Sequence, residues 1–103
     1  MTTQIGIDII CGNRDVTDDD RDRAENAALA VLEARDVTVD AARAEFRRQW
    51  AWLETGEAEA QGLAQDYRYL AGLAVVWWDA EAAADHALTE GWAVPGRAHC
   101  AIY

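Results

Sequence analysis

The sequence of residues 4–11 is QIGIDIIC, and its apolar side chains alternate. One face of the extended chain carries Ile5, Ile7, Ile9 and Cys11. The other face carries Gln4, Gly6, Asp8 and Ile10. This period of two predicts a strand with one buried face. Residues 97–103 alternate in the same way, with Ala98, Cys100 and Ile102 on one face. We therefore expect the two terminal segments to pair as antiparallel strands of a small sheet.

The region between these strands has the apolar spacing of helices. Thr17 followed by Asp20 predicts a capped helix start, and the apolar stripe continues to about Arg35. Thr38 or Asp40 can cap a second helix, which should end at Thr55-Gly56. Its stripe consists of Val39, Ala42, Phe46, Trp50 (or Gln49) and Leu53.

A third helix is expected to start near Glu57 and to continue as far as Trp77. Its stripe would be Leu63, Tyr67, Leu70, Ala74 and Trp77. Residues 73–78 are β-branched and aromatic enough to form a buried strand instead, but we favour a helix because the stripe continues through them. Asp79 is expected to cap a last helix, Ala80 to Glu90, closed by Gly91. Pro95-Gly96 has the order of a type II turn. The predicted fold is α+β, a single domain over residues 1–103 with about four helices and one small sheet.

Composition excludes several classes of chemistry. The 103 residues contain 19 acidic and 9 basic side chains, for a net charge of −10. All nine basic residues are arginine, and serine is absent, so serine nucleophiles, Schiff-base lysines and P-loops are ruled out. The negative field disfavours direct contact with nucleic acid or anionic membranes and favours a basic protein partner. The longest apolar run, Leu70 to Trp78, is too short to span a bilayer, and residues 1–6 lack a signal-peptide pattern. A cytoplasmic location is expected.

Neither a metal nor a cofactor is expected. Asp18, Asp20 and Asp22 have the spacing of the first calcium-loop ligands, but Arg23 and Leu29 occupy the positions that need glycine and glutamate. Capping explains these aspartates without a metal. The soft ligands are Cys11, His86, His99 and Cys100. They show no zinc spacing, and the adjacent His99 and Cys100 should point to opposite faces of a strand.

Acidic residues concentrate in two stretches, 54–66 and 79–90, which contain no basic residue. Glu81 and Asp85 would share one helix face. The side chains of Trp50 and Trp52 would point in different directions from a helix, and so would those of Trp77 and Trp78. At least one of these tryptophans should therefore be partly exposed. Exposed tryptophan is common in binding hot spots. Charge runs are also often only solvated faces. The candidate partner-binding residues are Glu57, Glu59, Asp66, Trp78, Asp79, Glu81, Asp85 and Glu90.

These patterns favour a non-catalytic acidic protein that binds a basic, nucleic-acid-binding partner and blocks its nucleic-acid surface. Small acidic phage inhibitors such as anti-restriction and anti-CRISPR proteins offer an analogy of size and charge, without a shared motif. One alternative is a homo-oligomeric structural protein, such as a homodimer, whose strand edges and tryptophans make the subunit interface. A second alternative is a small enzyme that uses Cys11 or Cys100.

Overall fold

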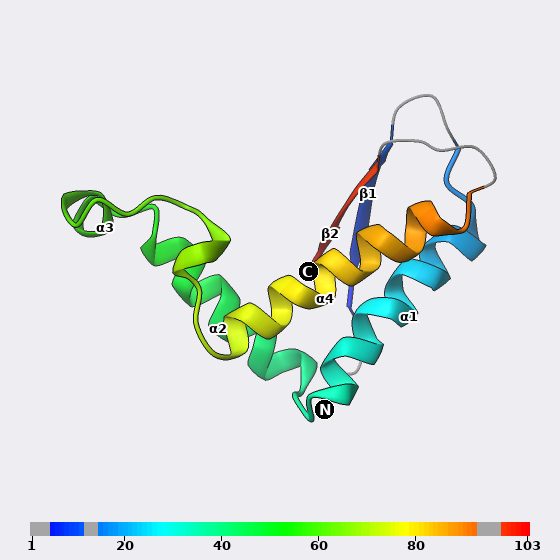
Figure 1. The fold of residues 1–103 in the computed structure, drawn as a ribbon, viewed down its shortest axis with the longest axis horizontal. Helices are drawn as coiled ribbons and strands as arrows, with labels where there is room; N and C mark the ends of the chain where they lie inside the picture. The colour runs from blue at the N-terminus through cyan, green and yellow to red at the C-terminus, as the bar shows by residue number, and fades with distance from the viewer. Residues whose placement is uncertain (1–4, 12–14, 93–97) are drawn as a thin grey trace.

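The computed structural model describes residues 5–11, 15–92 and 98–103 (Figure 1). Its fold is α+β, as the sequence predicts: four α-helices and one short 3-10 helix lie between two strands that pair with each other. In chain order the elements are β1 (Ile7–Cys11), α1 (Asp18–Ala34), α2 (Val39–Trp52), α3 (Gly56–Ala60), η1 (Tyr67–Tyr69), α4 (Leu73–Glu90) and β2 (Ala98–Ile102). Within the described ranges no helix is long and apolar enough to cross a membrane.

The sheet consists of β1 and β2, paired antiparallel with Ile7 opposite Ile102 and Ile9 opposite Cys100. Reciprocal backbone hydrogen bonds between Gly6 and Tyr103, at 2.7 and 3.0 Å, extend the pairing by one residue pair. The predicted pairing of the two terminal segments is confirmed. The predicted apolar faces are confirmed too, because Cys100 and Ile102 are buried while Asp8 and Ile10 are exposed.

The main core lies where α1, α4 and the inner face of the sheet meet, and α1 and α4 run side by side along most of their lengths (Figure 1). Fully buried alanines from both helices, with their small side chains, allow α1 and α4 to approach closely. The first turn of α2 also contributes to this core. Its buried helical members are Ala24, Ala28 and Leu32 of α1, Val39 and Ala42 of α2, and Trp77, Ala80, Ala84 and Leu88 of α4. At the start of α1, Thr17 and Asp20 form the predicted capping box, with bonds of 3.0 and 3.1 Å.

A second, smaller core joins the end of α2 to α3, η1 and the start of α4. Its buried members are Leu53, Ala58, Leu70 and Ala74. Thr38, rather than Asp40, caps α2. The predicted end of α2 at Thr55-Gly56 is wrong, because α2 ends at Trp52 and Thr55 caps α3.

The long third helix predicted from Glu57 to Trp77 is also wrong. The α3 helix stops at Ala60, and Gly62 and Gly72 have φ of 77° and 59°, which right-handed helices do not allow. The chain restarts as a helix only after Gly72, at Leu73. Residues 73–78 are helical, as favoured.

Asp79 does not cap a helix, which corrects a further prediction. Because Trp77 and Ala80 are buried on the same side, the apolar stripe crosses Asp79 without a break, and α4 continues to Glu90. Gly91 caps the C-terminus of α4, as predicted. The turn predicted at Pro95-Gly96 lies outside the described residues.

Candidate protein-binding surface

Two of the candidate acidic residues, Glu81 and Asp85, contact the protein's own backbone. The Glu81 carboxylate accepts a hydrogen bond from the Ile102 amide at 3.3 Å, and the Asp85 carboxylate accepts one from the Cys100 amide. The second Asp85 oxygen lies 3.4 Å from Nδ1 of His99. Both carboxylates therefore cover the outer edge of β2 instead of projecting freely into solvent.

Burial at this contact raises two pKa values. Desolvation raises the pKa of Glu81 above its usual range, although the Ile102 amide acts in the opposite direction. Burial, together with the nearby Asp85 carboxylate, raises the pKa of the Cys100 thiol to about 12. A buried thiol that holds its proton is a poor nucleophile, so Cys100 lacks the setting of a catalytic cysteine.

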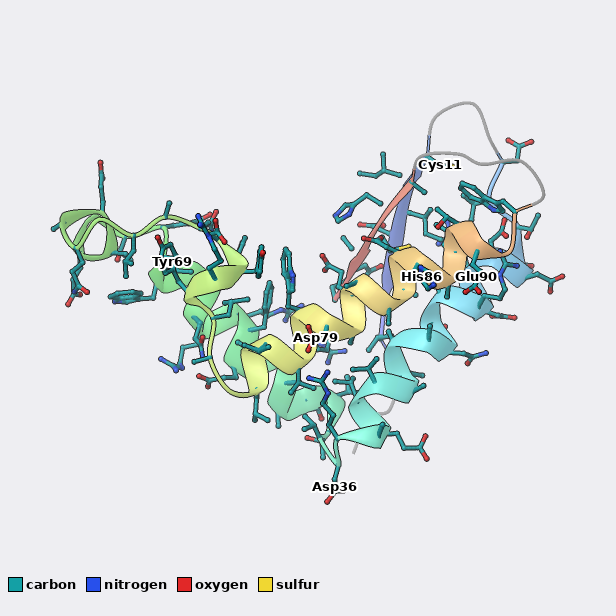
Figure 2. All side chains as sticks on the ribbon, in the orientation of Figure 1. Cys11, Asp36, Tyr69, Asp79, His86 and Glu90 are labelled. Carbon is teal, nitrogen blue, oxygen red and sulfur yellow. The ribbon has the colours of Figure 1, made fainter. Side chains whose placement is uncertain are left out.

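Three more candidates form ion pairs within the chain. Asp79 lies 2.7 Å from Arg35 of α1, and Asp66 lies 2.8 Å from Arg68. Hydrogen bonds from Arg68 hold the pKa of Asp66 below its usual range. Glu90 faces His86 at 3.4 Å, one turn away on α4. Figure 2 shows Asp79 near the middle of α4, with His86 and Glu90 nearer its C-terminus and Tyr69 at the opposite end of the molecule.

Glu57 and Glu59 have a different environment. Both are exposed on α3, and neither makes an ion pair within residues 15–92. In Figure 1, α3 lies at the tip of the molecule, far from the sheet. We call residues 50–72, which comprise the end of α2, α3, η1 and their connecting loops, the arm. The arm carries Glu54, Glu57, Glu59 and Asp66 against the single base Arg68, a net charge of −3.

Aromatic rings cover the base of the arm. Trp78 stacks between Trp50, with ring centroids 5.8 Å apart, and Tyr67, at 5.9 Å. Phe46 stacks on Trp50 at 5.4 Å. Trp77, by contrast, is 1% exposed in the main core. The predicted divergence of the two neighbouring tryptophans is thus confirmed.

Tyrosines give the arm exposed aromatic surface. Tyr67 is 57% exposed and Tyr69 is 41% exposed, both in η1. The sequence pattern places Tyr67 only in a helix stripe and assigns no role to Tyr69. The signal that could have identified both residues is the segment 66–69, in which two tyrosines flank an arginine directly after an acidic stretch.

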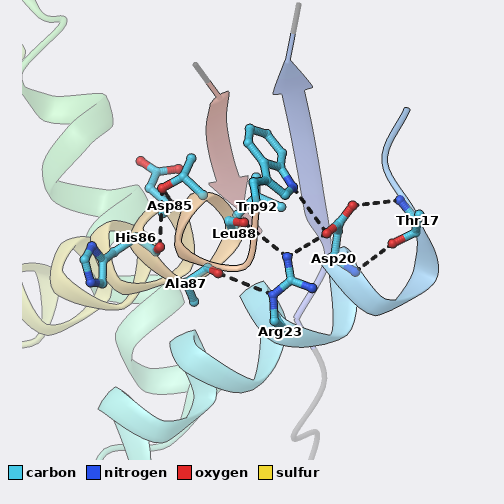
Figure 3. Close-up of polar contacts among 9 residues, drawn as sticks. Thr17, Asp20, Arg23, Asp85, His86, Ala87, Leu88 and Trp92 are labelled. Atoms are coloured by element: carbon cyan, nitrogen blue, oxygen red, sulfur yellow. Dashed lines mark hydrogen bonds and ion pairs between the residues drawn. The ribbon is translucent and has the colours of Figure 1, made fainter. Parts of the chain in front are cut away.

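A polar network that no sequence pattern predicts joins α1 and α4 (Figure 3). Asp20 accepts hydrogen bonds from Arg23 at 2.6 Å and from the Trp92 indole at 3.3 Å, besides its bond to the Thr17 amide. Arg23 in turn donates to the carbonyl of Leu88 at 3.1 Å. The network ties the start of α1 to the end of α4. These bonds hold the pKa of Asp20 down at about 2.

Neither a metal site nor a similar known protein indicates what this protein does. Among the residues that the structure describes, no group of three His, Cys, Asp or Glu side chains is placed to hold a metal ion. Comparison with protein-family models, curated proteins and solved structures finds no match. The fold and the arm therefore define only a class, a small acidic α+β protein with an exposed acidic and aromatic surface.

Proposed function

We propose that the protein is a non-catalytic binding module that docks its arm on a basic protein. The observation that carries this proposal is that one projecting segment holds exposed carboxylates, which form no ion pair with the described residues, and exposed tyrosines. Carboxylates provide charge complementarity and speed encounter with a basic surface. Tyrosine is a frequent anchor in protein interfaces.

The partner proposed is a nucleic-acid-binding protein whose basic surface the arm occupies. Glu54, Glu57 and Glu59 place three carboxylates within a six-residue stretch that contains no base, so they present a concentrated negative charge. A surface built to hold phosphates offers the matching positive charge. Binding of the arm would exclude nucleic acid from that surface, and the protein would act as an inhibitor.

The contacts of Glu81 and Asp85 refine the set of residues involved. Their oxygens already accept hydrogen bonds from β2, whereas Glu57 and Glu59 accept none from the described part of the chain. We therefore assign the first contacts to Glu57 and Glu59, with Tyr67 and Tyr69 as apolar anchors. We assign Asp66, Asp79 and Glu90 no direct contact; they contribute only to the negative electrostatic field of the protein.

The test is a pull-down with the tagged full-length chain from a nuclease-treated lysate, eluted with rising salt and identified by mass spectrometry. The binding variant is Glu57→Arg with Glu59→Arg. The matched control is Asp22→Arg with Glu33→Arg, which changes the net charge equally on exposed positions of α1. Circular dichroism of both variants checks that they fold.

We expect the wild type and the α1 control to capture one nucleic-acid-binding protein that DNA or RNA displaces, and we expect the arm variant to lose it. If both variants lost the partner equally, net charge alone would explain the loss, and the assignment of binding to the arm would be overturned. A captured partner that nucleic acid fails to displace would overturn the inhibitor proposal.

A further inference from the structure

One face of the Tyr67 ring is covered and the other is open. The covered face lies against Trp78, with ring centroids 5.9 Å apart and ring planes inclined by only 11°. Trp78 in turn stacks on Trp50 of α2 at 5.8 Å. Since 57% of Tyr67 is exposed, the face that points away from Trp78 is in contact with solvent. Tyr67 is therefore the exposed end of a ring stack built from α2, α4 and η1.

Side-chain amides fix both ends of the segment that carries this ring. At one end, the Gln65 amide donates to the carbonyl of Trp50 at 3.0 Å. At the other end, Gln49 donates to the carbonyl of Ala71 at 3.0 Å and accepts from its amide at 2.9 Å. The open face of Tyr67 is thus held in place before a partner arrives, and a preorganised surface loses less entropy on binding.

The charge of the arm limits what can stack on this open face. The arm has a net charge of −3, so it repels phosphates and carboxylates and attracts cations. The quadrupole of an aromatic ring attracts a cation placed over its face. The guanidinium of arginine is flat, weakly hydrated and suited to stacking, whereas the ammonium of lysine is a strongly hydrated point charge. Arginine is therefore the side chain that best fits an aromatic face in an acidic segment.

The chain already contains this arrangement within η1. The guanidinium of Arg68 lies 6.0 Å from the centroid of the Tyr69 ring, and one of its nitrogens lies 2.8 Å from the Asp66 carboxylate. One arginine thus contacts a ring and a carboxylate together. The neighbouring ring of Tyr67 offers the same kind of surface to an arginine from outside the chain.

We propose that the arm binds an arginine-rich segment of its protein partner, with one guanidinium stacked on the open face of Tyr67. Further arginines of that segment face the exposed carboxylates of Glu57 and Glu59 on α3. Arginine, and not basic charge in general, is then the chemistry that the arm recognises, which rests on the proposed function and deepens it. Tyr67 determines the specificity, and the two glutamates supply the attraction.

The test is isothermal titration calorimetry of the full-length chain with two synthetic decapeptides of equal charge, one alternating arginine with glycine and the other lysine with glycine. We expect the arginine peptide to bind about fivefold more tightly. Tyr67→Leu should reduce this preference to less than about twofold, whereas Tyr67→Phe keeps the ring and should retain it. The matched control is Tyr103→Leu, which removes a tyrosine of similar exposure, 52%, next to β2 and should also retain the preference. Circular dichroism checks that each variant folds.

Proton NMR adds a signature that a general loss of affinity would not produce. The ring current of Tyr67 should shift the δ-methylene protons of the bound arginine peptide upfield, and Tyr67→Leu should remove this shift while Tyr103→Leu keeps it. The proposal is overturned if neither peptide binds the wild type at millimolar concentration, if both bind equally, or if Tyr67→Leu keeps the full preference for arginine.

The same titrations separate this proposal from the docking of the arm on a basic protein. Equal binding of both peptides that Glu57→Arg with Glu59→Arg abolishes would overturn the selection of arginine and would support docking through the carboxylates of the arm. An arginine preference and an affinity that both survive this double substitution would support stacking on Tyr67 and would overturn the first contacts assigned to the two glutamates.

Discussion

Glu81 on α4 accepts the amide hydrogen of Ile102 on β2 at 3.3 Å, and this contact is one of a matched pair. Four residues along α4, Asp85 binds the amide of Cys100, two residues back along β2. Four helical residues rise by about 6 Å, and two strand residues by about 6.6 Å. Carboxylates one turn apart therefore align with the outward amides of an antiparallel strand. The helix closes one edge of the sheet.

Removing these carboxylates should destabilise the fold. Glu81→Ala and Asp85→Ala each leave a backbone amide without its acceptor, so we expect each to lower the free energy of unfolding by about 1–3 kcal/mol. Glu81→Gln and Asp85→Asn keep an acceptor oxygen and should cost less. Urea denaturation measures the difference, with Glu57→Ala on exposed α3 as the control. Alanine variants as stable as wild type would show that the amides need no carboxylate.

The acid limb of stability should depend on Asp20. Its folded pKa of about 2 lies below the ordinary value of 3.8, because the Thr17 amide, Arg23 and Trp92 bind the charged form. Its stabilising effect is complete above pH 3.8 and is lost as the pH falls through about 2. We expect Asp20→Asn to lose about 1–2 kcal/mol at pH 6, and the deficit to disappear near pH 2.

Thermal unfolding of both proteins across this pH range measures that dependence. Asparagine keeps an oxygen for the Thr17 amide, so the variant removes mainly the charge. Asp19→Asn, an exposed neighbour in the same first turn, is the matched control. A deficit that persists unchanged to pH 2 would mean that shape, and not ionisation, accounts for the role of Asp20.

Local patterns were sufficient for part of this structure. The alternation of Ile5 to Cys11 and the Thr17–Asp20 capping box involve residues close in sequence, and both predictions are confirmed. The third helix failed because apolar spacing does not report the positive φ of Gly62 and Gly72. At both positions the glycine, and not the apolar stripe, was the signal that the helix would be interrupted.

The candidate site was less predictable, for a physical reason. Whether Glu81 and Asp85 face solvent or a strand depends on where β2 packs, and β2 joins α4 only in the folded chain. The i, i+4 spacing that indicated a solvent-facing acidic row is also the spacing that matches a strand edge. The Asp20–Trp92 bond likewise joins residues 72 positions apart, beyond the reach of any local pattern.

Gly91 should be sensitive to substitution through a distant arginine. A Cβ atom there would lie 2.4 Å from the guanidinium of Arg23, which donates to the carbonyls of Ala87 and Leu88. The backbone φ of −75° tolerates alanine, so the cost is displacement of Arg23. We expect Gly91→Ala to lower the free energy of unfolding by about 1 kcal/mol.

A double-mutant cycle separates this cause from a general helix effect. In an Arg23→Ala background the clash is absent, so Gly91→Ala should cost nothing further. Gly56→Ala, where the new Cβ meets no atom within 4 Å, is the control and should be neutral or slightly stabilising. Equal costs of Gly91→Ala in both backgrounds would contradict the displacement of Arg23.

Thiol labelling should distinguish the two cysteines. Cys100 has no exposed surface, and burial with the Asp85 carboxylate raises its pKa to about 12, so little thiolate forms at pH 8. Cys11 is only partly buried. We expect iodoacetamide to modify Cys11 at least about a hundredfold faster in the folded protein, and both equally in urea. Mass spectrometry of the peptides gives both rates. Asp85→Asn should leave Cys100 protected, since burial is the larger cause. Fast labelling of Cys100 in the folded protein would contradict its burial and would restore the case for cysteine chemistry.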